Sequence, residues 1–224
     1  IQAFKIEGDF ITHEIINSGY INTTYKIITS KDCYILQKIN TNVFENALIL
    51  MDNIQFALPI LSAEDYEQIT FLSTRTGKNH LIQNNEFWRM MTYIPNSTTY
   101  NTTTKPATAF EAGRIIGKFH QLLQDIDTAI FKDTLPQFHQ LSHRKHEFQQ
   151  ALQTSDTEKL TTAQAAITKA QHFITELQQL NISGLPIRVC HNDTKLNNIL
   201  FSKNSEKALC LIDLDTIMKG FFFY

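Results

Sequence analysis

Apolar and polar positions alternate along the first 40 residues, and a turn-forming segment follows each alternating run. The runs cover residues 11–16, 23–28 and 34–39, and the turns cover 17–20 and 30–32. A period of two is typical of strands that bury one face, while Asn, Gly, Ser and Asp favour turns. The pattern therefore predicts three paired strands in succession.

The spacing of apolar residues then changes to that of an amphipathic helix. Asn42 and Glu45 have the spacing of a capping box and indicate where this helix begins. Its apolar positions are Val43, Ala47, Leu50, Met51 and Ile54. Further apolar runs predict a hairpin formed by residues 70–73 and 80–82, and a last strand at 87–94.

A segment rich in Ser, Thr and Asn at residues 96–104 marks the expected boundary between two lobes. Residues 1–95 are predicted to form a small antiparallel lobe with one helix, and 96–224 a mainly helical lobe. Pro106 is expected to open the first helix of that lobe, because proline is favoured at the first helical position. A long apolar stripe between residues 160 and 177 predicts a second helix that contributes to the core.

The strongest chemical signal is the segment His191-Asn192-Asp193-Thr194-Lys195-Leu196-Asn197-Asn198, which holds an H-x-D motif and an Asn five residues after its Asp. Two apolar runs follow, joined by a polar turn at 202–206, and the second run ends at Ile212-Asp213-Leu214-Asp215. A hairpin of this length returns Asp213 to the side of Asn198. The same order of groups occurs in the catalytic and metal-binding elements of kinase-type phosphotransferases.

Each residue of this set has an expected role in phosphoryl transfer from ATP. Asp193 is predicted to accept the proton of the attacking hydroxyl, and Lys195 to neutralise charge on the transferred group. Asn198 and Asp213 are predicted to hold Mg²⁺, which favours oxygen ligands and phosphate oxygens. Asp215 is either a second metal ligand or a residue that orients the site. The predicted cofactors are therefore ATP and Mg²⁺.

Composition argues against several other classes of protein. A hydrophobic content of 42% over 224 residues is enough for a sizeable core, and a formal net charge of −2 gives no reason to expect a nucleic-acid partner. Three widely spaced cysteines predict reduced thiols instead of disulfides or a zinc site. Because neither a membrane span nor a signal peptide is recognised, we expect a cytoplasmic protein without a membrane partner.

The loop and the carboxylate strand resemble those of the aminoglycoside phosphotransferase and choline kinase superfamily, and several stretches are similar to N-acetylhexosamine 1-kinases. These stretches are 18–25, 34–40, 43–44, 135–139, 191–195 and 212–216. The resemblance implies a bilobal, protein-kinase-like α+β fold with a catalytic hairpin. It also implies transfer of the ATP γ-phosphate to the anomeric hydroxyl of a free N-acetylhexosamine, a small-molecule sugar acceptor, giving the sugar 1-phosphate.

The same resemblance implies that the C-terminal lobe is incomplete in this sequence. Members of the superfamily continue beyond the metal-binding Asp with helices that help to line the acceptor pocket. The chain starts at Ile1 and ends with an apolar run at 221–224. We therefore expect it to be a piece of a longer protein.

The nucleotide site is expected at the first strand turn and at the last strand of the N-terminal lobe. By likeness to kinases, the turn covers the phosphates, which gives Ser18, Gly19 and Asn22 as candidates. Met91 and Tyr93 are candidates for the hinge that binds adenine.

The third strand departs from the usual kinase pattern, in which a lysine binds the phosphates. The strand register favours Gln37 at this position, whereas Lys38 next to it is chemically better suited. Successive strand side chains point to opposite faces, so only one of the two can face ATP. Both are candidates for nucleotide binding.

The acceptor pocket is expected to include Phe138, His139 and Arg144, in a segment that also carries other histidines. Such side chains suit hydroxyls and an amide better than a cation. The alternatives are a kinase for choline, homoserine or an aminoglycoside, or a non-catalytic nucleotide-binding or scaffold protein on a kinase fold.

Overall fold

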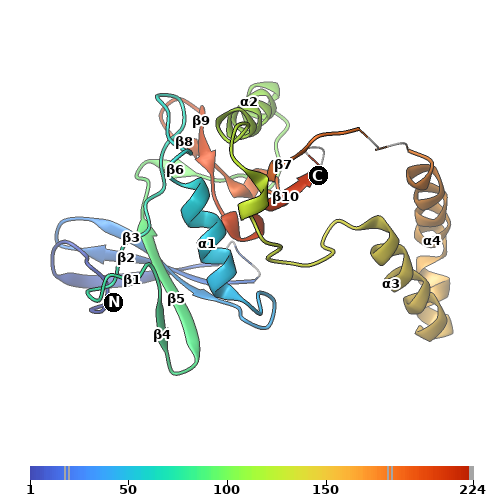
Figure 1. The fold of residues 1–224 in the computed structure, drawn as a ribbon, viewed down its shortest axis with the longest axis horizontal. Coiled ribbons are helices and arrows are strands. Elements are labelled where there is room, and N and C mark those ends of the chain that lie inside the picture. The colour runs from blue at the N-terminus through green and yellow to red at the C-terminus, as the bar shows by residue number, and fades with distance from the viewer. Residues whose placement is uncertain (18, 20, 181, 183, 222–224) are drawn as a thin grey trace. The chain divides into compact units, whose positions relative to one another are not determined.

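The computed structural model of the protein describes residues 1–17, 19, 21–180, 182 and 184–221 (Figure 1). The chain divides into two compact units, Ile1–Leu135 with Ile187–Tyr224, and Pro136–Pro186, here named unit 1 and unit 2. Both sides of the lobe boundary expected at residues 95 and 96 belong to unit 1, so that boundary stays a prediction.

A five-stranded antiparallel sheet forms the N-terminal part of unit 1. Its strands are β1 (Phe10–Ile16), β2 (Thr23–Thr29), β3 (Cys33–Ile39), β4 (Leu81–Gln83) and β5 (Glu86–Thr92), in the order β1-β2-β3-β5-β4. The three alternating runs and the last strand are thus confirmed to within two residues. The predicted pairing of 70–73 with 80–82 is wrong, because Leu81–Gln83 pairs with β5 instead. Asn84 and Asn85 form the connecting turn with φ of 53° and 60°, values that Asn tolerates well.

Helix α1 (Ala47–Ala57) follows β3 and contributes to the main core of unit 1. Its N-cap is Asn46, whose side chain accepts a hydrogen bond from the Ile49 amide, so the helix begins later than the expected capping box. Leu50, Met51 and Ile54 are fully buried on its inner face. The same apolar cluster includes Ile39 and Phe87 from the sheet, and Phe119, Phe201 and Leu211 from the C-terminal part of unit 1. One continuous core therefore holds the sheet and the C-terminal hairpin together.

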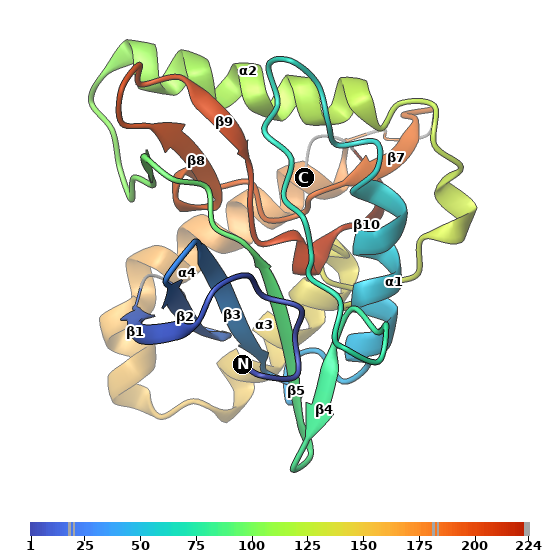
Figure 2. The same ribbon diagram turned by 90° about the vertical axis from the view of Figure 1, so that its left-hand side faces the viewer.

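The rest of unit 1 consists of one helix and two small sheets. These elements are β6 (Ser97–Thr98), α2 (Pro106–Leu122), β7 (Ile187–Cys190), β8 (Ile199–Ser202), β9 (Ala208–Leu211) and β10 (Met218–Phe221), with short 3₁₀ turns η1 (Thr128–Ile130), η2 (Leu196–Asn198) and η3 (Leu214–Thr216). Strand β8 pairs with β6 and β9, and β10 pairs with β7. Helix α2 begins at Pro106 as predicted and lies along β9, where Arg114 Nη2 donates to the Ala208 carbonyl at 2.7 Å (Figure 2).

Unit 2 is a pair of helices, α3 (Leu141–Thr154) and α4 (Thr157–Gln178). Asp156 caps α4 by accepting from the Lys159 amide at 2.8 Å. The predicted helix is confirmed, but its apolar stripe is not core: α3 and α4 contain no buried residue in the described structure, and Leu177 is 48% exposed. Within the part of the chain that the structure describes, no helix has both the length and the apolar character needed to cross a bilayer.

Candidate active site

The loop after β7 is held in place by His191, whose side chain is completely buried. Its Nε2 donates to the Ile212 carbonyl at 2.8 Å, and its Nδ1 accepts from the Asp193 amide at 3.3 Å. Burial lowers the pKa of His191, which favours the neutral ring that this pairing needs. His191 therefore ties the backbone of the loop to the end of the strand that precedes Asp213.

Asn192 adds a second anchor, which the sequence reasoning did not identify. Its backbone is left-handed, with φ of 63°, and its Nδ2 donates to the carbonyls of Cys190, Thr216 and Met218 at 3.0, 2.9 and 3.3 Å. The buried amide thus joins the ends of β7 and β10 beneath the loop. The available signal in the sequence was an Asn between His191 and Asp193, since Asn adopts a left-handed backbone more readily than most residues.

Asp193 projects from this anchored loop with one-third of its side chain exposed. Its Oδ2 accepts from Lys195 Nζ at 2.7 Å and from Asn198 Nδ2 at 2.9 Å. Its Oδ1 has no partner among the described residues. The carboxylate is therefore held in place through one oxygen, and the other oxygen is free to accept a proton.

Asn198 and Asp213 lie next to each other, as the hairpin pattern predicts. The Ile212 amide donates to the Asn198 carbonyl at 2.8 Å, and Asp213 follows in a left-handed conformation with φ of 62°. The Asp213 side chain lines the cavity described below and is exposed there, although the protein atoms packed around its carboxyl weaken the hydration of the charge. This desolvation, with the nearby charge of Asp215, raises the pKa of Asp213 to about 6, against the opposing effect of Arg89.

These two residues fit a magnesium ion that is shared with a nucleotide. Asn198 Oδ1 accepts no hydrogen bond from the described residues, and the Asp213 carboxyl lies in a negative environment that a cation would relieve. Among residues that the structure describes, no group of three or more His, Cys, Asp and Glu side chains could hold a metal alone. Mg²⁺ commonly needs only one or two protein carboxylates when phosphates complete its coordination.

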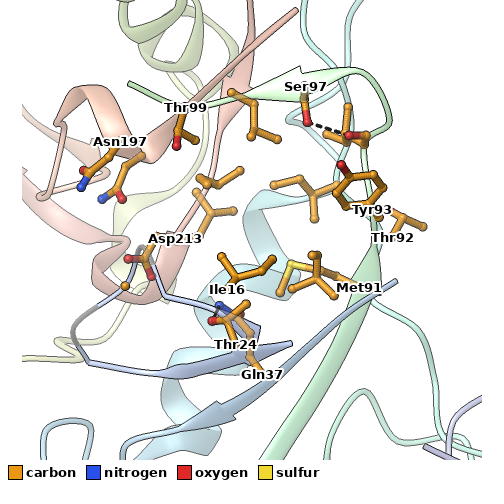
Figure 3. A pocket seen from close by; sticks show the side chains of 18 of the residues that line it. Ile16, Thr24, Gln37, Met91, Thr92, Tyr93, Ser97, Thr99, Asn197 and Asp213 are labelled. Atoms are coloured by element: carbon orange, nitrogen blue, oxygen red, sulfur yellow. Dashed lines mark hydrogen bonds between the residues drawn. The ribbon is translucent and has the colours of Figure 1, made fainter. Parts of the chain in front are cut away.

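A cavity of about 360 Å³ lies between the five-stranded sheet and the β8–β9 hairpin within unit 1 (Figure 3). Predicted site residues that line it are Gly19, Gln37, Met91, Tyr93, Asn198 and Asp213. Figure 3 shows Asp213 and Asn197 on one side of the cavity and Met91 and Tyr93 on the other, with Gln37 and Thr24 along the sheet. A volume of this size is within the range that small-molecule and cofactor sites occupy.

The register of β3 determines whether Gln37 or Lys38 faces this cavity. Gln37 lines it, and its Nε2 donates to Thr24 Oγ1 at 3.1 Å. Lys38 points to the other face of the sheet, where its Nζ binds Glu86 at 3.1 Å and lies 5.9 Å from the centre of the Trp88 ring. The β3 position that faces the cavity therefore carries no lysine.

The cation beside Gln37 is Arg89, which sequence reasoning missed. Arg89 is 1% exposed, and its Nη2 forms an ion pair with Asp215 Oδ1 at 2.5 Å. Its Nε and Nη2 both donate to Gln37 Oε1, at 3.0 and 2.8 Å. The signal in the sequence was a charged residue inside an apolar strand, because such residues are rarely buried without a partner.

Asp215 and Asn22 take part in this buried network and do not line the cavity. Asn22 Nδ2 donates to Asp215 Oδ2 at 2.6 Å, while the ion pair with Arg89 is the contact of Asp215 Oδ1, which accepts no hydrogen bond from the described residues. Asn22 Oδ1 accepts from the Asn40 amide at 3.0 Å. In this arrangement Asp215 is the ion-pair partner of Arg89 and accepts from Asn22, and its role as metal ligand or orienting residue stays a prediction.

The remaining candidates lie outside this site. Ser18 is outside the described residues. Phe138, His139 and Arg144 belong to unit 2, where the rings of Phe138 and His139 have centroids 4.4 Å apart. Arg144 Nε donates to the Phe138 carbonyl at 3.0 Å, and its Nη1 binds Glu147 at 2.6 Å. Their part in acceptor binding stays a prediction.

Comparison with known proteins places this geometry in a family. Residues 12–224 match the Phosphotransferase enzyme family, which is also abbreviated APH. The chain belongs to this family. The match begins within β1 and extends over the cavity, the loop after β7 and the strand that leads to Asp213, so it includes every residue of the site described above.

Solved structures show the fold of this phosphotransferase-family chain. It is 17% identical to the microcompartment-associated aminopropanol kinase, with a TM-score of 0.69 over 95% of this chain and 66% of that one. It is 14% identical to a spectinomycin phosphotransferase in complex with ADP and spectinomycin, with a TM-score of 0.63 over 96% of this chain and 67% of that one. It is 12% identical to an aminoglycoside phosphotransferase from Alicyclobacillus acidocaldarius, with a TM-score of 0.61 over 95% of this chain and 64% of that one.

These likenesses confirm the predicted α+β, protein-kinase-like fold with an antiparallel N-terminal sheet. The chain spans about two thirds of the length of these structures, between 64% and 67%.

Proposed function

We propose that this chain carries the catalytic centre of a small-molecule kinase, which transfers the γ-phosphoryl group of ATP to a hydroxyl of its acceptor. The observation that carries the proposal is that Asn198 and Asp213 line one cavity, and that Asp193, outside this lining, accepts a hydrogen bond from Asn198 at 2.9 Å. The acceptor that we propose is an N-acetylhexosamine, phosphorylated on its anomeric hydroxyl.

In this proposal the nucleotide occupies the cavity with its base toward β5. Met91 and Tyr93 supply apolar and aromatic surface there, while the Tyr93 amide already donates to the Cys33 carbonyl at 3.3 Å. The phosphates then lie toward Gln37, Asn198 and Asp213. Asn198 and Asp213 would hold Mg²⁺, and the bound ion would neutralise charge that develops on the phosphates.

Asp193 is placed to act as the base for the acceptor hydroxyl. Its Oδ2 is fixed by Lys195 and Asn198, so the free Oδ1 can take the proton as the oxygen attacks phosphorus. Lys195 lies beside the same oxygen and can neutralise charge on the group in transfer. All of these groups come from a loop whose backbone is anchored by His191 and Asn192, so little reorganisation is needed before reaction.

The sugar acceptor is supported by the resemblance of the motif stretches to N-acetylhexosamine 1-kinases and by the character of Phe138, His139 and Arg144. A second candidate is an acceptor that carries an amino group. The fold neighbours favour it, because their names specify aminopropanol and spectinomycin as small acceptors. Both candidates use the same centre and differ only in the pocket that receives the hydroxyl.

The test is ADP release from Mg·ATP by the full-length protein that contains this chain. The acceptors are N-acetylglucosamine, N-acetylgalactosamine, glucose, choline, homoserine, aminopropanol and kanamycin, and the blank is Asp193→Asn. Turnover with an N-acetylhexosamine alone supports the proposal and identifies the sugar. Turnover with an amine-bearing acceptor overturns the sugar assignment and retains the kinase. If the protein binds nucleotide but phosphorylates no acceptor of the panel, the result contradicts the kinase proposal for these acceptors. It then supports the alternative of a non-catalytic nucleotide-binding protein.

A further inference from the structure

The buried guanidinium of Arg89 has one edge without a hydrogen-bond partner among the residues that the structure describes. Asp215 and Gln37 occupy Nη2 and Nε, and the ring of Phe71 lies 5.3 Å from the guanidinium carbon. Arg89 Nη1 is buried and has no hydrogen-bond partner among the described residues. A buried polar group left unpaired costs free energy, so this edge is suited to an acceptor that the protein chain does not provide.

The position of Arg89 shows which acceptor fits. It lines the same cavity as Gln37, Gly19 and Asp213, on the strand next to β3, and Gln37 and Arg89 are direct cross-strand neighbours. The β3 residue that faces the cavity is Gln37, which carries no charge, while Lys38 is bound to Glu86 on the opposite face. Arg89 is thus the cation that the described structure presents at the sheet side of the cavity. A guanidinium with two free N–H groups matches the oxygens of a phosphate.

We propose that Arg89 binds the phosphate oxygens of the nucleotide through Nη1 and takes the place of the lysine that kinases carry on the third strand, with Gln37 and Asp215 as positioning residues. This assignment rests on the proposed function, because it requires that the cavity receive a nucleotide. The ion pair with Asp215 does not prevent the role, since protein kinases hold their strand lysine through an ion pair with a glutamate. Here the acidic partner comes from the segment that follows the metal-binding carboxylate, so it links the phosphate contact to that segment.

Nucleotide binding measured without metal tests the phosphate contact of Arg89 separately from catalysis. We would titrate the full-length protein with ADP and with adenosine in the presence of EDTA by calorimetry. Arg89→Gln should weaken ADP binding by about 10- to 100-fold, the range expected for lost charge-assisted hydrogen bonds, and leave adenosine binding within about twofold. The matched control is Lys38→Gln, which removes a cation from the other face of the same region and should change neither affinity.

Two further variants guard against a simple loss of folding. Arg89→Gln with Asp215→Asn removes both buried charges, and circular dichroism and thermal unfolding establish that it is folded; it should show the same selective loss of ADP affinity. Arg89→Gln with Gln37→Lys returns the cation to β3, beside its original position, and should restore at least part of the affinity for ADP. A merely structural role for Arg89 predicts equal losses for ADP and adenosine, and no rescue by a lysine at position 37.

The outcomes distinguish this assignment from the proposed function. If the wild-type protein binds ADP, and the folded Arg89 variants bind it equally well or lose adenosine in parallel, the assignment to Arg89 is wrong and the kinase proposal stands. If the wild-type protein binds neither ADP nor adenosine, and binding is still absent when Mg²⁺ replaces EDTA, the proposed function is overturned, and the assignment is overturned with it.

Discussion

The two oxygens of Asp193 have different surroundings, and this difference leads to the first prediction. Asp193→Asn keeps an oxygen that can accept from Lys195 and Asn198, but removes the basic carboxylate. We therefore expect kcat to fall by about 10²- to 10⁴-fold, the usual contribution of a general base, while ADP affinity stays within about twofold. Steady-state kinetics with an acceptor that the panel identifies, together with ADP titration, measure both quantities.

The matched control is Asp52→Asn, an exposed aspartate on α1. It should leave both kcat and ADP affinity unchanged. Wild-type turnover by Asp193→Asn would show that Asp193 is not the base, whatever its position.

Asp213 leads to a prediction about pH in the absence of metal. Its pKa is raised from 3.8 to about 6 by burial and by Asp215 and Asp193, against the effects of Arg89 and Lys195. The folded state therefore binds this proton more tightly than the unfolded state. The resulting stabilisation is fully present below pH 4 and is lost as the pH rises through about 6. Because the carboxyl is exposed to the cavity, we expect an effect on the order of 1 kcal/mol.

Asp213→Asn should abolish this pH dependence, because an amide does not titrate. Urea unfolding of the wild type and the variant in EDTA, between pH 4 and pH 7, gives the difference in the free energy of unfolding at each pH. The wild type should lose stability relative to the variant as the pH rises. If the difference in the free energy of unfolding between the two proteins did not change with pH, the pKa of Asp213 would be the same in the folded and unfolded states.

At the scale of elements, the strands that carry the catalytic loop depend on Asn192. Its side chain satisfies three carbonyls where β7 and β10 meet, and its backbone has φ of 63°. Asn192→Ala removes the bonds and also strains the backbone, so we expect the free energy of unfolding to fall by about 2–4 kcal/mol. Asn192→Gly removes the bonds without the strain and should cost about 1 kcal/mol less.

Urea unfolding of the three proteins measures these differences. Equal stabilities for the Ala and Gly variants would show that the left-handed backbone adds no strain. A stability of the Ala variant equal to that of the wild type would show that the three carbonyls find other partners.

At the scale of elements, the sequence predicts well those features that depend on residues close together in the chain. Alternation and turn residues are local, so β1, β2, β3 and β5 were predicted closely. The partner of β4 was missed because the turn-forming residues 75–79 favoured a hairpin with residues 70–73, whereas the turn that leads from β4 to its partner is at Asn84 and Asn85. The stripe on α4 was predicted correctly as helical and wrongly as core, because periodicity identifies an apolar face without identifying what covers it.

For the whole molecule, the proximity of the candidate catalytic residues could be predicted from the sequence, and the buried network around Arg89 could not. Asp193, Asn198 and Asp213 lie within 21 residues of one another, so hairpin geometry alone brings them together. The Asn22–Asp215 bond joins residues 193 positions apart, and Arg89 reaches its partners only after the sheet has formed. Such pairings depend on the register of strands and on the shared core, which no local pattern records.

This division of the site across the chain leads to a last prediction, that nucleotide and metal stabilise unit 1 as a whole. The cavity walls come from the sheet and from the hairpin, so a ligand that binds both adds to the free energy of unfolding. A concentration of Mg·ADP about 100 times Kd contributes roughly 2.7 kcal/mol, which for a chain of this size raises Tm by roughly 5–10 °C. Scanning calorimetry of the full-length protein with ADP, Mg²⁺ or both measures the shift.

Asp213→Ala should remove the part of this shift that depends on Mg²⁺ and keep the part that ADP produces alone. The reason is that Asp213 supplies the carboxylate for the metal, whereas the phosphate contact proposed for Arg89 does not require it. Asp52→Ala, which removes an exposed carboxylate on α1, should respond as the wild type does. An equal Mg²⁺-dependent shift in Asp213→Ala would mean that the metal is held by other groups, and the roles of Asp213 and Asn198 would then have to be reassigned.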